Sequence, residues 1–141
     1  MQENNRIKLS RTAFTTAKQA DAPMISLTTR DGKITFNLRA RTLMKLKHEE
    51  YIDVFEEKTK TSTRFGFQKT DDKIDSYCLR QRQSTSKHPP LCIINKALQR
   101  HIQKEIGKFG NLHAQLASQP DDEGIWWILE SSWKESNQKI S

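Results

Sequence analysis

Residues 31–67 hold the pattern that most constrains the fold, because short runs of alternating apolar and polar residues are separated there by turn-forming residues. Asp31-Gly32 lies between two such runs, and this dipeptide favours a tight β-hairpin turn. Asn37 follows the second run in a position suited to cap a helix. The predicted elements of this half are strands at 24–27, 34–36, 51–55 and 63–67 and a helix at 38–47.

The same order of elements is expected again in residues 77–130. Asn95 directly follows a short apolar strand, as Asn37 does, and begins a longer helix. The predicted elements of this half are strands at 77–83, 91–94, 112–116 and 125–130 and a helix at 96–108. The net charge alternates in parallel: it is +7 over 1–48, −3 over 49–78, +6 over 79–108 and −3 over 109–141. We therefore predict an internal duplication of residues 24–67 and 77–130.

These patterns predict an α+β fold made mainly of an antiparallel sheet or a small barrel, from two similar β-hairpin–helix–β-hairpin halves. Residues 24–130 would form a single domain, with the doubly apolar segment 125–130 lying centrally in the core. Residues 131–141 are expected to form a C-terminal tail. Residues 1–23 are polar and basic, and they predict either a flexible arm or an arm that orders on a polyanion or a partner.

The composition excludes some locations and classes. The chain has 141 residues, 34% of them hydrophobic, and a formal net charge of +7. No apolar run reaches the ~18 residues that a membrane-spanning helix requires. Residues 1–23 lack the apolar core of a signal peptide. We therefore expect a cytoplasmic protein without a membrane partner, or one carried within a virus particle.

The helix expected at 96–108 has an apolar side and a basic side. Its apolar stripe, which we expect to be buried, consists of Leu98, Ile102 and Ile106. Its basic row recurs at the same spacing and consists of Lys96, Arg100, Lys104 and Lys108. Such a row is either a solvated surface or a ridge that contacts phosphates, and the sequence leaves both interpretations open.

Further basic residues on the other expected elements would share one face with this helix. The predicted nucleic-acid-binding residues are Lys33, Arg39, Arg41, Arg80, Arg82, Lys96, Arg100 and Lys104. The aromatic residues lie mainly within apolar runs, which indicates core positions rather than stacking platforms for bases.

The sequence contains none of the common catalytic signatures, such as a G-x-S-x-G elbow, an H-E-x-x-H helix or a phosphate-binding glycine loop. Cys78 and Cys92 lack metal-ligand spacing and are expected to be buried thiols. The four histidines are scattered, without a metal-binding pair. We therefore expect no enzyme activity, no cofactor and no metal site.

Residues 32–67 resemble the AbrB/MazE-like family of swapped-hairpin DNA-binding domains, through the stretches GKITFN, RTLMKL, EEYIDVF and RFGF. In that family two such units, normally from two chains, interlock into one barrel whose basic face binds DNA. The resemblance implies that Lys33, Arg39 and Arg41 lie at or near DNA-facing positions. The chain departs from the family at Asn37, where a proline is usual, and at Glu49-Glu50, where Gly-Asp is usual.

The expected function is therefore that of a non-enzymatic nucleic-acid-binding protein, such as a transcriptional regulator, with DNA as the preferred ligand. The alternative is a structural or interaction component of a mobile element or virus particle. In that case basic and acidic segments would pair between subunits, so the partner would be an acidic protein surface. Self-association into a homo-oligomer is compatible with both.

Overall fold

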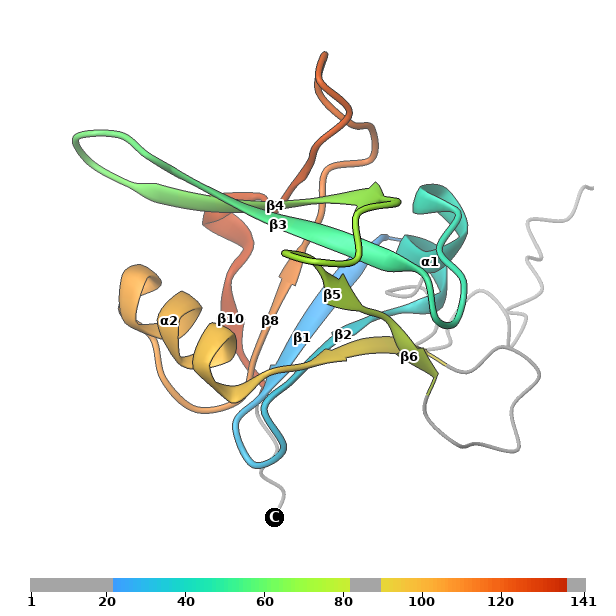
Figure 1. Ribbon diagram of the computed structural model, residues 1–141. Coiled ribbons are helices and arrows are strands. Elements are labelled where there is room, and N and C mark those ends of the chain that lie inside the picture. The colour runs from blue at the N-terminus through green and yellow to red at the C-terminus, as the bar shows by residue number, and fades with distance from the viewer. Residues whose placement is uncertain (1–21, 82–89, 137–141) are drawn as a thin grey trace, which may run out of the picture.

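The computed structural model describes residues 22–81 and 90–136 and has the predicted α+β fold (Figure 1). The first half contains β1 (Met24–Thr28), β2 (Lys33–Phe36), α1 (Leu38–Met44), β3 (Tyr51–Lys58) and β4 (Thr63–Thr70). The second half contains β5 (Tyr77–Cys78), β6 (Arg80–Gln81), β7 (Leu91–Ile94), α2 (Lys96–Ile106), β8 (Leu112–Gln115), β9 (Trp126–Trp127), the 3-10 helix η3 (Glu130–Ser132) and β10 (Lys134–Glu135).

The strands form two antiparallel sheets rather than one closed barrel. The larger sheet has the order β10-β8-β1-β2-β7-β6, and the smaller one has the order β5-β3-β4-β9. The sheets approach each other at two places: only Leu79 separates β5 from β6, and an isolated bridge joins Leu116 to Ile128. The expectation of a mainly antiparallel α+β fold is thus confirmed, and its strands form open sheets instead of a small barrel.

In both sheets the hairpin of the first half is flanked on each side by strands of the second half. In the larger sheet β1 pairs with β8 and β2 pairs with β7. In the smaller sheet β3 pairs with β5 and β4 pairs with β9. The second half departs from the order of the first: three short strands, β5, β6 and β7, precede α2, and β8 and β9 belong to different sheets, whereas β3 and β4 pair with each other. Both halves have an asparagine-capped helix between strands, and the duplication of residues 24–67 and 77–130 stays a prediction for a structural superposition.

The core lies between the sheets and follows from the alternation seen in the sequence. Ile25 and Leu27 on β1 point inward with Ile34 and Phe36 on β2, while the residues between them are partly exposed. Phe36 meets Phe67 of the other sheet edge-to-face, with 5.0 Å between the ring centroids. Each sheet therefore contributes the apolar face of its strands to the core.

Several segments differ from the expected boundaries, and the single strand expected at 77–83 is divided in its described part into β5 and β6, which belong to different sheets. Helix α1 ends at Met44 because Lys45 takes a left-handed conformation (φ 57°), which turns the chain so that Leu46 is buried. Strands β3 and β4 extend beyond the predicted 51–55 and 63–67. Of the segment 125–130, only β9 is a strand, and it lies at the edge of the smaller sheet instead of at its centre.

The sequence predicts a basic arm at the N-terminus and a tail at the C-terminus. Residues 1–21, most of the predicted basic arm, lie outside the described residues. In the segment expected to be a C-terminal tail, β10 pairs with β8 and Trp133 is buried. Neither of the helices in the described ranges has the length and apolar character needed to cross a bilayer.

Candidate nucleic-acid interface

Helix α2 presents its basic row to solvent and its opposite side to the core. Asn95 caps the helix, since its Oδ1 accepts a hydrogen bond of 2.9 Å from the backbone N–H of Leu98. Ile102 is fully buried, and Lys96, Arg100 and Lys104 are exposed. This arrangement follows from the helical period, because a position two residues along lies about 200° around the axis.

The buried side of α2 is broader than the apolar stripe predicts. Leu98 and Ile106 are only partly buried, whereas Gln99 and Gln103 are 1% and 4% exposed. Gln99 Nε2 donates to Gln103 Oε1 (2.6 Å), and Gln103 Nε2 donates to the carbonyl of Gly110 (2.7 Å). These two bonds satisfy part of the buried amide groups, whereas Gln99 Oε1 has no hydrogen-bond partner among the described residues, and the second bond holds the loop after the helix against the helix itself.

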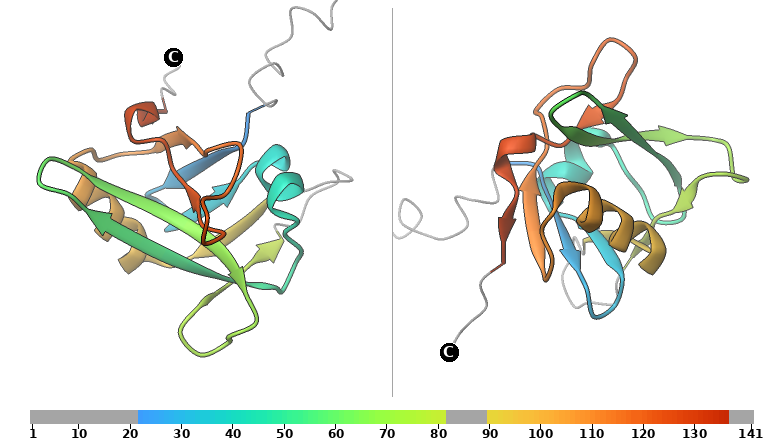
Figure 2. Two further views of the ribbon diagram at one scale, coloured as in Figure 1. Left: turned by 90° about the horizontal axis from the view of Figure 1, so that it is seen from above. Right: turned by 90° about the vertical axis from the view of Figure 1, so that its left-hand side faces the viewer.

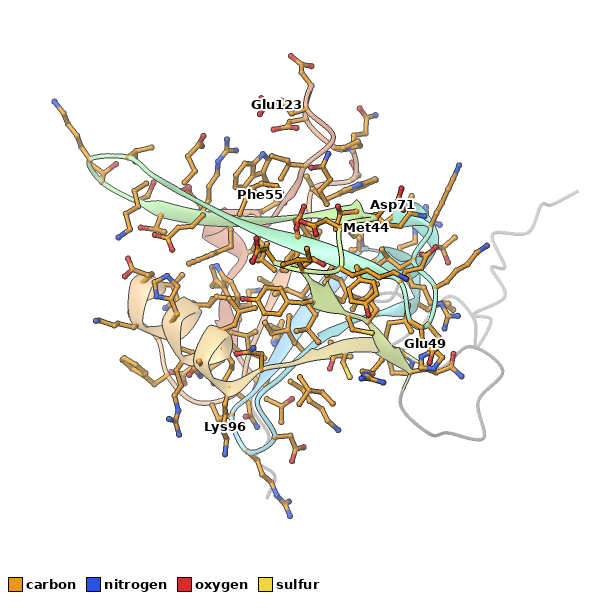
Figure 3. The ribbon with its side chains drawn as sticks, viewed as in Figure 1. Met44, Glu49, Phe55, Asp71, Lys96 and Glu123 are labelled. Carbon is orange, nitrogen blue, oxygen red and sulfur yellow. The ribbon has the colours of Figure 1, made fainter. Side chains whose placement is uncertain are left out.

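The β1–β2 turn is fixed against the first residue of α2. Asn95 N–H donates to the carbonyl of Gly32 (2.9 Å), and a Cβ atom at Gly32 would lie 2.8 Å from Lys96 Cγ. Gly32 also has φ +65°, so this position favours glycine for both its conformation and its space. Figure 3 shows Lys96 beside this turn, at the lower end of the molecule in that view.

A second contact joins the turn to the loop that follows α2. Asn111 Oδ1 accepts hydrogen bonds from the backbone N–H and the hydroxyl of Thr29, at 3.0 and 3.1 Å. The turn, the helix and the loop are thus tied together at three points. We call the cations on these three segments the α2 basic surface, which consists of Arg30, Lys33, Lys96, Arg100, Lys104 and Lys108.

The α2 basic surface has little internal charge compensation. Lys33 approaches Asp31 at 3.9 Å, and the other five cations form no ion pair with any residue of the described ranges. Like charges spaced four residues apart on a helix repel each other. An anionic partner that contacted the row would relieve this repulsion.

The nearby carboxylates Glu56 and Glu105 already contact basic side chains outside the row. Glu56 on β3 contacts His101 Nε2 at 2.5 Å, and Lys58 lies between Glu56 (3.4 Å) and Glu105 (3.3 Å). The hydrogen bond from His101 lowers the pKa of Glu56, and the hydrogen bond to Glu105 raises the pKa of Lys58. This network joins α2 to β3 and leaves Glu105 unable to neutralise the basic row.

The structure brings together only part of the predicted site. Lys33 lies on β2 next to the turn that contacts α2, so it joins the basic row of that helix. Arg39 and Arg41 lie on α1, at the opposite end of the sheets from α2 (Figure 1 and the left view of Figure 2). Arg80 lies on the edge strand β6, opposite Cys92, and Arg82 falls outside the described residues.

Three members of the interface region were not predicted as site residues: Arg30, Phe109 and Lys108, the last of which was recognised only as part of the basic row. Arg30 is exposed in the β1–β2 turn, and its position before Asp31-Gly32 was the available signal, since hairpin turns lie at the ends of sheets. Phe109 is 64% exposed in the loop after α2. Its position between Gly107 and Gly110 marks a loop, but aromatic type alone favoured a core position.

A surface depression lies elsewhere, and its polar groups bond to one another. It has a volume of about 590 Å³ and is bordered by Arg64, Asp121 and Trp127. The guanidinium of Arg64 lies 3.9 Å from the Trp127 ring centroid and 2.6 Å from Glu57. Trp127 Nε1 donates to Asp121 (2.8 Å) and lowers its pKa. In the described part of the chain, no three His, Cys, Asp or Glu residues are grouped to hold a metal ion.

Comparisons with known proteins add no relative, since the family models, the curated proteins and the solved structures that were searched contain no match to this chain.

Proposed function

We propose that this protein is a non-enzymatic nucleic-acid-binding protein, such as a transcriptional regulator, and that the α2 basic surface is its contact with phosphates. The observation that carries the proposal is the row of Lys96, Arg100 and Lys104, exposed and without ion pairs among the described residues. The row spans about 12 Å, since a helix rises 1.5 Å per residue. A strand of duplex DNA carries a phosphate about every 3.4 Å of axis, so roughly three phosphates lie within this span.

The resemblance to swapped-hairpin DNA-binding domains belongs to the same proposal. The pairing of strands between the halves supports it, because that family combines two interlocked units. The two separate sheets are a point of difference from the family's barrel. A nucleic-acid ligand fits a cytoplasmic location or one within a virus particle.

The test is the salt dependence of binding to a duplex, measured by fluorescence anisotropy over a range of NaCl concentrations. Each lost phosphate contact reduces the slope of log affinity against log salt by about 1. The double variant Arg100→Gln/Lys104→Gln should therefore bind more weakly to all sequences and show a slope smaller by about 2.

The matched control removes the same charge from the other end of the molecule. Lys45→Gln/Lys47→Gln changes two exposed cations just after α1, neither of which is a predicted binding residue. Its slope should stay close to that of the unchanged protein. Equal losses in the two double variants would show a response to net charge alone and would overturn the assignment to α2.

A second candidate is an interaction component that associates through complementary charge. Its support is the acidic connection between β4 and β5, where Asp72 and Asp75 raise the pKa of the already partly buried Asp53. These carboxylates repel one another within one copy, so the α2 basic surface of a second copy would stabilise them. Sedimentation of the free protein at low salt distinguishes this candidate, because it requires oligomers that dissociate when salt is added.

A further inference from the structure

Phe109 is an exposed aromatic residue on a loop that is held by hydrogen bonds directly after it, at Gly110 and Asn111. The loop begins after Gly107 and contains Gly110, both with positive φ (74° and 89°). Gln103 holds the carbonyl of Gly110, and Thr29 holds the side chain of Asn111. The ring is thus displayed by a fixed backbone, with 64% of the residue accessible to solvent. A large apolar ring presented in this way is suited to contact a partner.

The charges around Phe109 define the chemistry of that partner. Lys108 precedes Phe109, and Lys104 belongs to the last turn of α2. The loop residues 107–111 include no acidic residue, and the nearest acidic residue in sequence, Glu105, is paired with Lys58 at 3.3 Å. A ligand at this position must therefore combine negative charge with a flat apolar surface. Phosphates and nucleobases provide this combination in one molecule.

We infer that Phe109 stacks on an unpaired base while Lys104 and Lys108 contact the phosphates on either side of it, so that the preferred ligand is single-stranded nucleic acid. This inference rests on the proposed function. In a duplex the faces of internal bases are covered by their neighbours, and only a single strand, a loop or an end offers a base face to an exposed ring. Stacking is tolerant of sequence, because every base has an aromatic face.

The experiment compares the affinities of variants for a single-stranded oligonucleotide about 20 nucleotides long and for the duplex of the same sequence. DNA and RNA versions of the single strand separate the two sources of the same chemistry. Phe109→Ala should weaken single-strand binding by about 5- to 150-fold, the range that loss of one stacked base produces. The salt slope should be unchanged, because no charge is removed.

Two further variants control for folding and for general hydrophobicity. Phe109→Trp should keep the single-strand affinity, and its added tryptophan emission should be quenched when the oligonucleotide binds. Ile74→Ala removes an even more exposed apolar side chain (87%) from the acidic β4–β5 connection, and it should leave binding unchanged.

The outcomes separate this inference from the proposed function. Weaker binding of Arg100→Gln/Lys104→Gln together with full single-strand affinity of Phe109→Ala would overturn the stacking role and keep nucleic-acid binding. Full affinity of both variants would overturn both. Vesicles containing an anionic phospholipid serve as the competing probe: binding to them that depends on Phe109, without a preference for single strands over duplex, would also overturn the inference.

Discussion

At the scale of single residues, β3 carries two carboxylates whose pKa values shift in opposite directions. Burial raises the pKa of Asp53, and repulsion by Asp72 and Asp75 adds to the shift. The hydrogen bond from His101 lowers the pKa of Glu56. A raised carboxyl pKa means that the folded protein holds the proton more tightly than the unfolded chain does, and a lowered pKa means the reverse.

Asp53→Asn is therefore expected to stabilise the protein at neutral pH. The ionised Asp53 lowers the free energy of unfolding at about pH 7, and this penalty disappears as the pH falls through the raised pKa. The variant should show a higher melting temperature than the unchanged protein near pH 7, and the difference should shrink in acid. Melting curves recorded by circular dichroism at a series of pH values measure this.

Glu56→Gln is the matched control with the opposite sign. The lowered pKa of Glu56 contributes stability that is present above the ordinary carboxyl value and is lost as the pH falls through the lowered one. The variant should melt at a lower temperature near neutral pH and approach the unchanged protein in acid. A destabilising Asp53→Asn with a gap independent of pH would contradict the account of β3.

At the scale of elements, the two helices are capped by the same residue type but with different numbers of bonds. Asn95 Oδ1 accepts one hydrogen bond, from Leu98 N–H. Asn37 Oδ1 accepts bonds from Ala40 N–H (2.8 Å) and Met24 N–H (3.1 Å), and its Nδ2 donates to the carbonyl of Ala22 (2.9 Å). Asn37 thus joins α1 to the start of β1 as well as capping the helix.

Replacing the two caps should have unequal effects. Asn95→Ala should cost about 1 kcal/mol, the usual value for a helix N-cap. Asn37→Ala should cost about 2–4 kcal/mol, because two further bonds worth roughly 0.5–1.5 kcal/mol each are lost with the cap. Urea unfolding of the two variants gives both values. Equal losses would mean that the bonds to Met24 and Ala22 contribute nothing to stability.

The elements that the sequence predicted well are those with local signals. Both asparagine caps could be identified because an N-cap bonds to amides only a few residues away. The burial of Gln99 and Gln103 could not, since it depends on the return of the loop at Gly110. The length of the strand expected at 125–130 was overestimated, because its apolar residues are largely buried but only β9 pairs with β4.

At the scale of the whole molecule, most of the element order could be predicted, whereas the positions of the basic residues of different elements relative to one another could not. The site residues on α1 and α2 carry similar charge patterns, yet the sheets place the two helices at opposite ends (Figure 2). Lys33 joins α2 only because β2 pairs with β7, whose end leads into the helix. Pairings between residues far apart in the chain decide such neighbours, and local patterns do not encode them.

Because strands of the second half flank the hairpins of the first half in both sheets, we predict that neither half folds alone. A cut between Lys73 and Ile74, in an exposed connection, leaves fragments 1–73 and 74–141, and every pairing of β1 with β8, β2 with β7, β3 with β5 and β4 with β9 then joins different fragments. A hairpin without its sheet neighbours is at best marginally stable in water. Each fragment alone should therefore unfold without a cooperative transition, while an equimolar mixture should form a one-to-one complex with the far-ultraviolet circular dichroism spectrum of the intact chain. Size-exclusion chromatography and thermal melts of the fragments and the mixture test this, and a fragment that melts cooperatively by itself would show that its sheet does not need the other half.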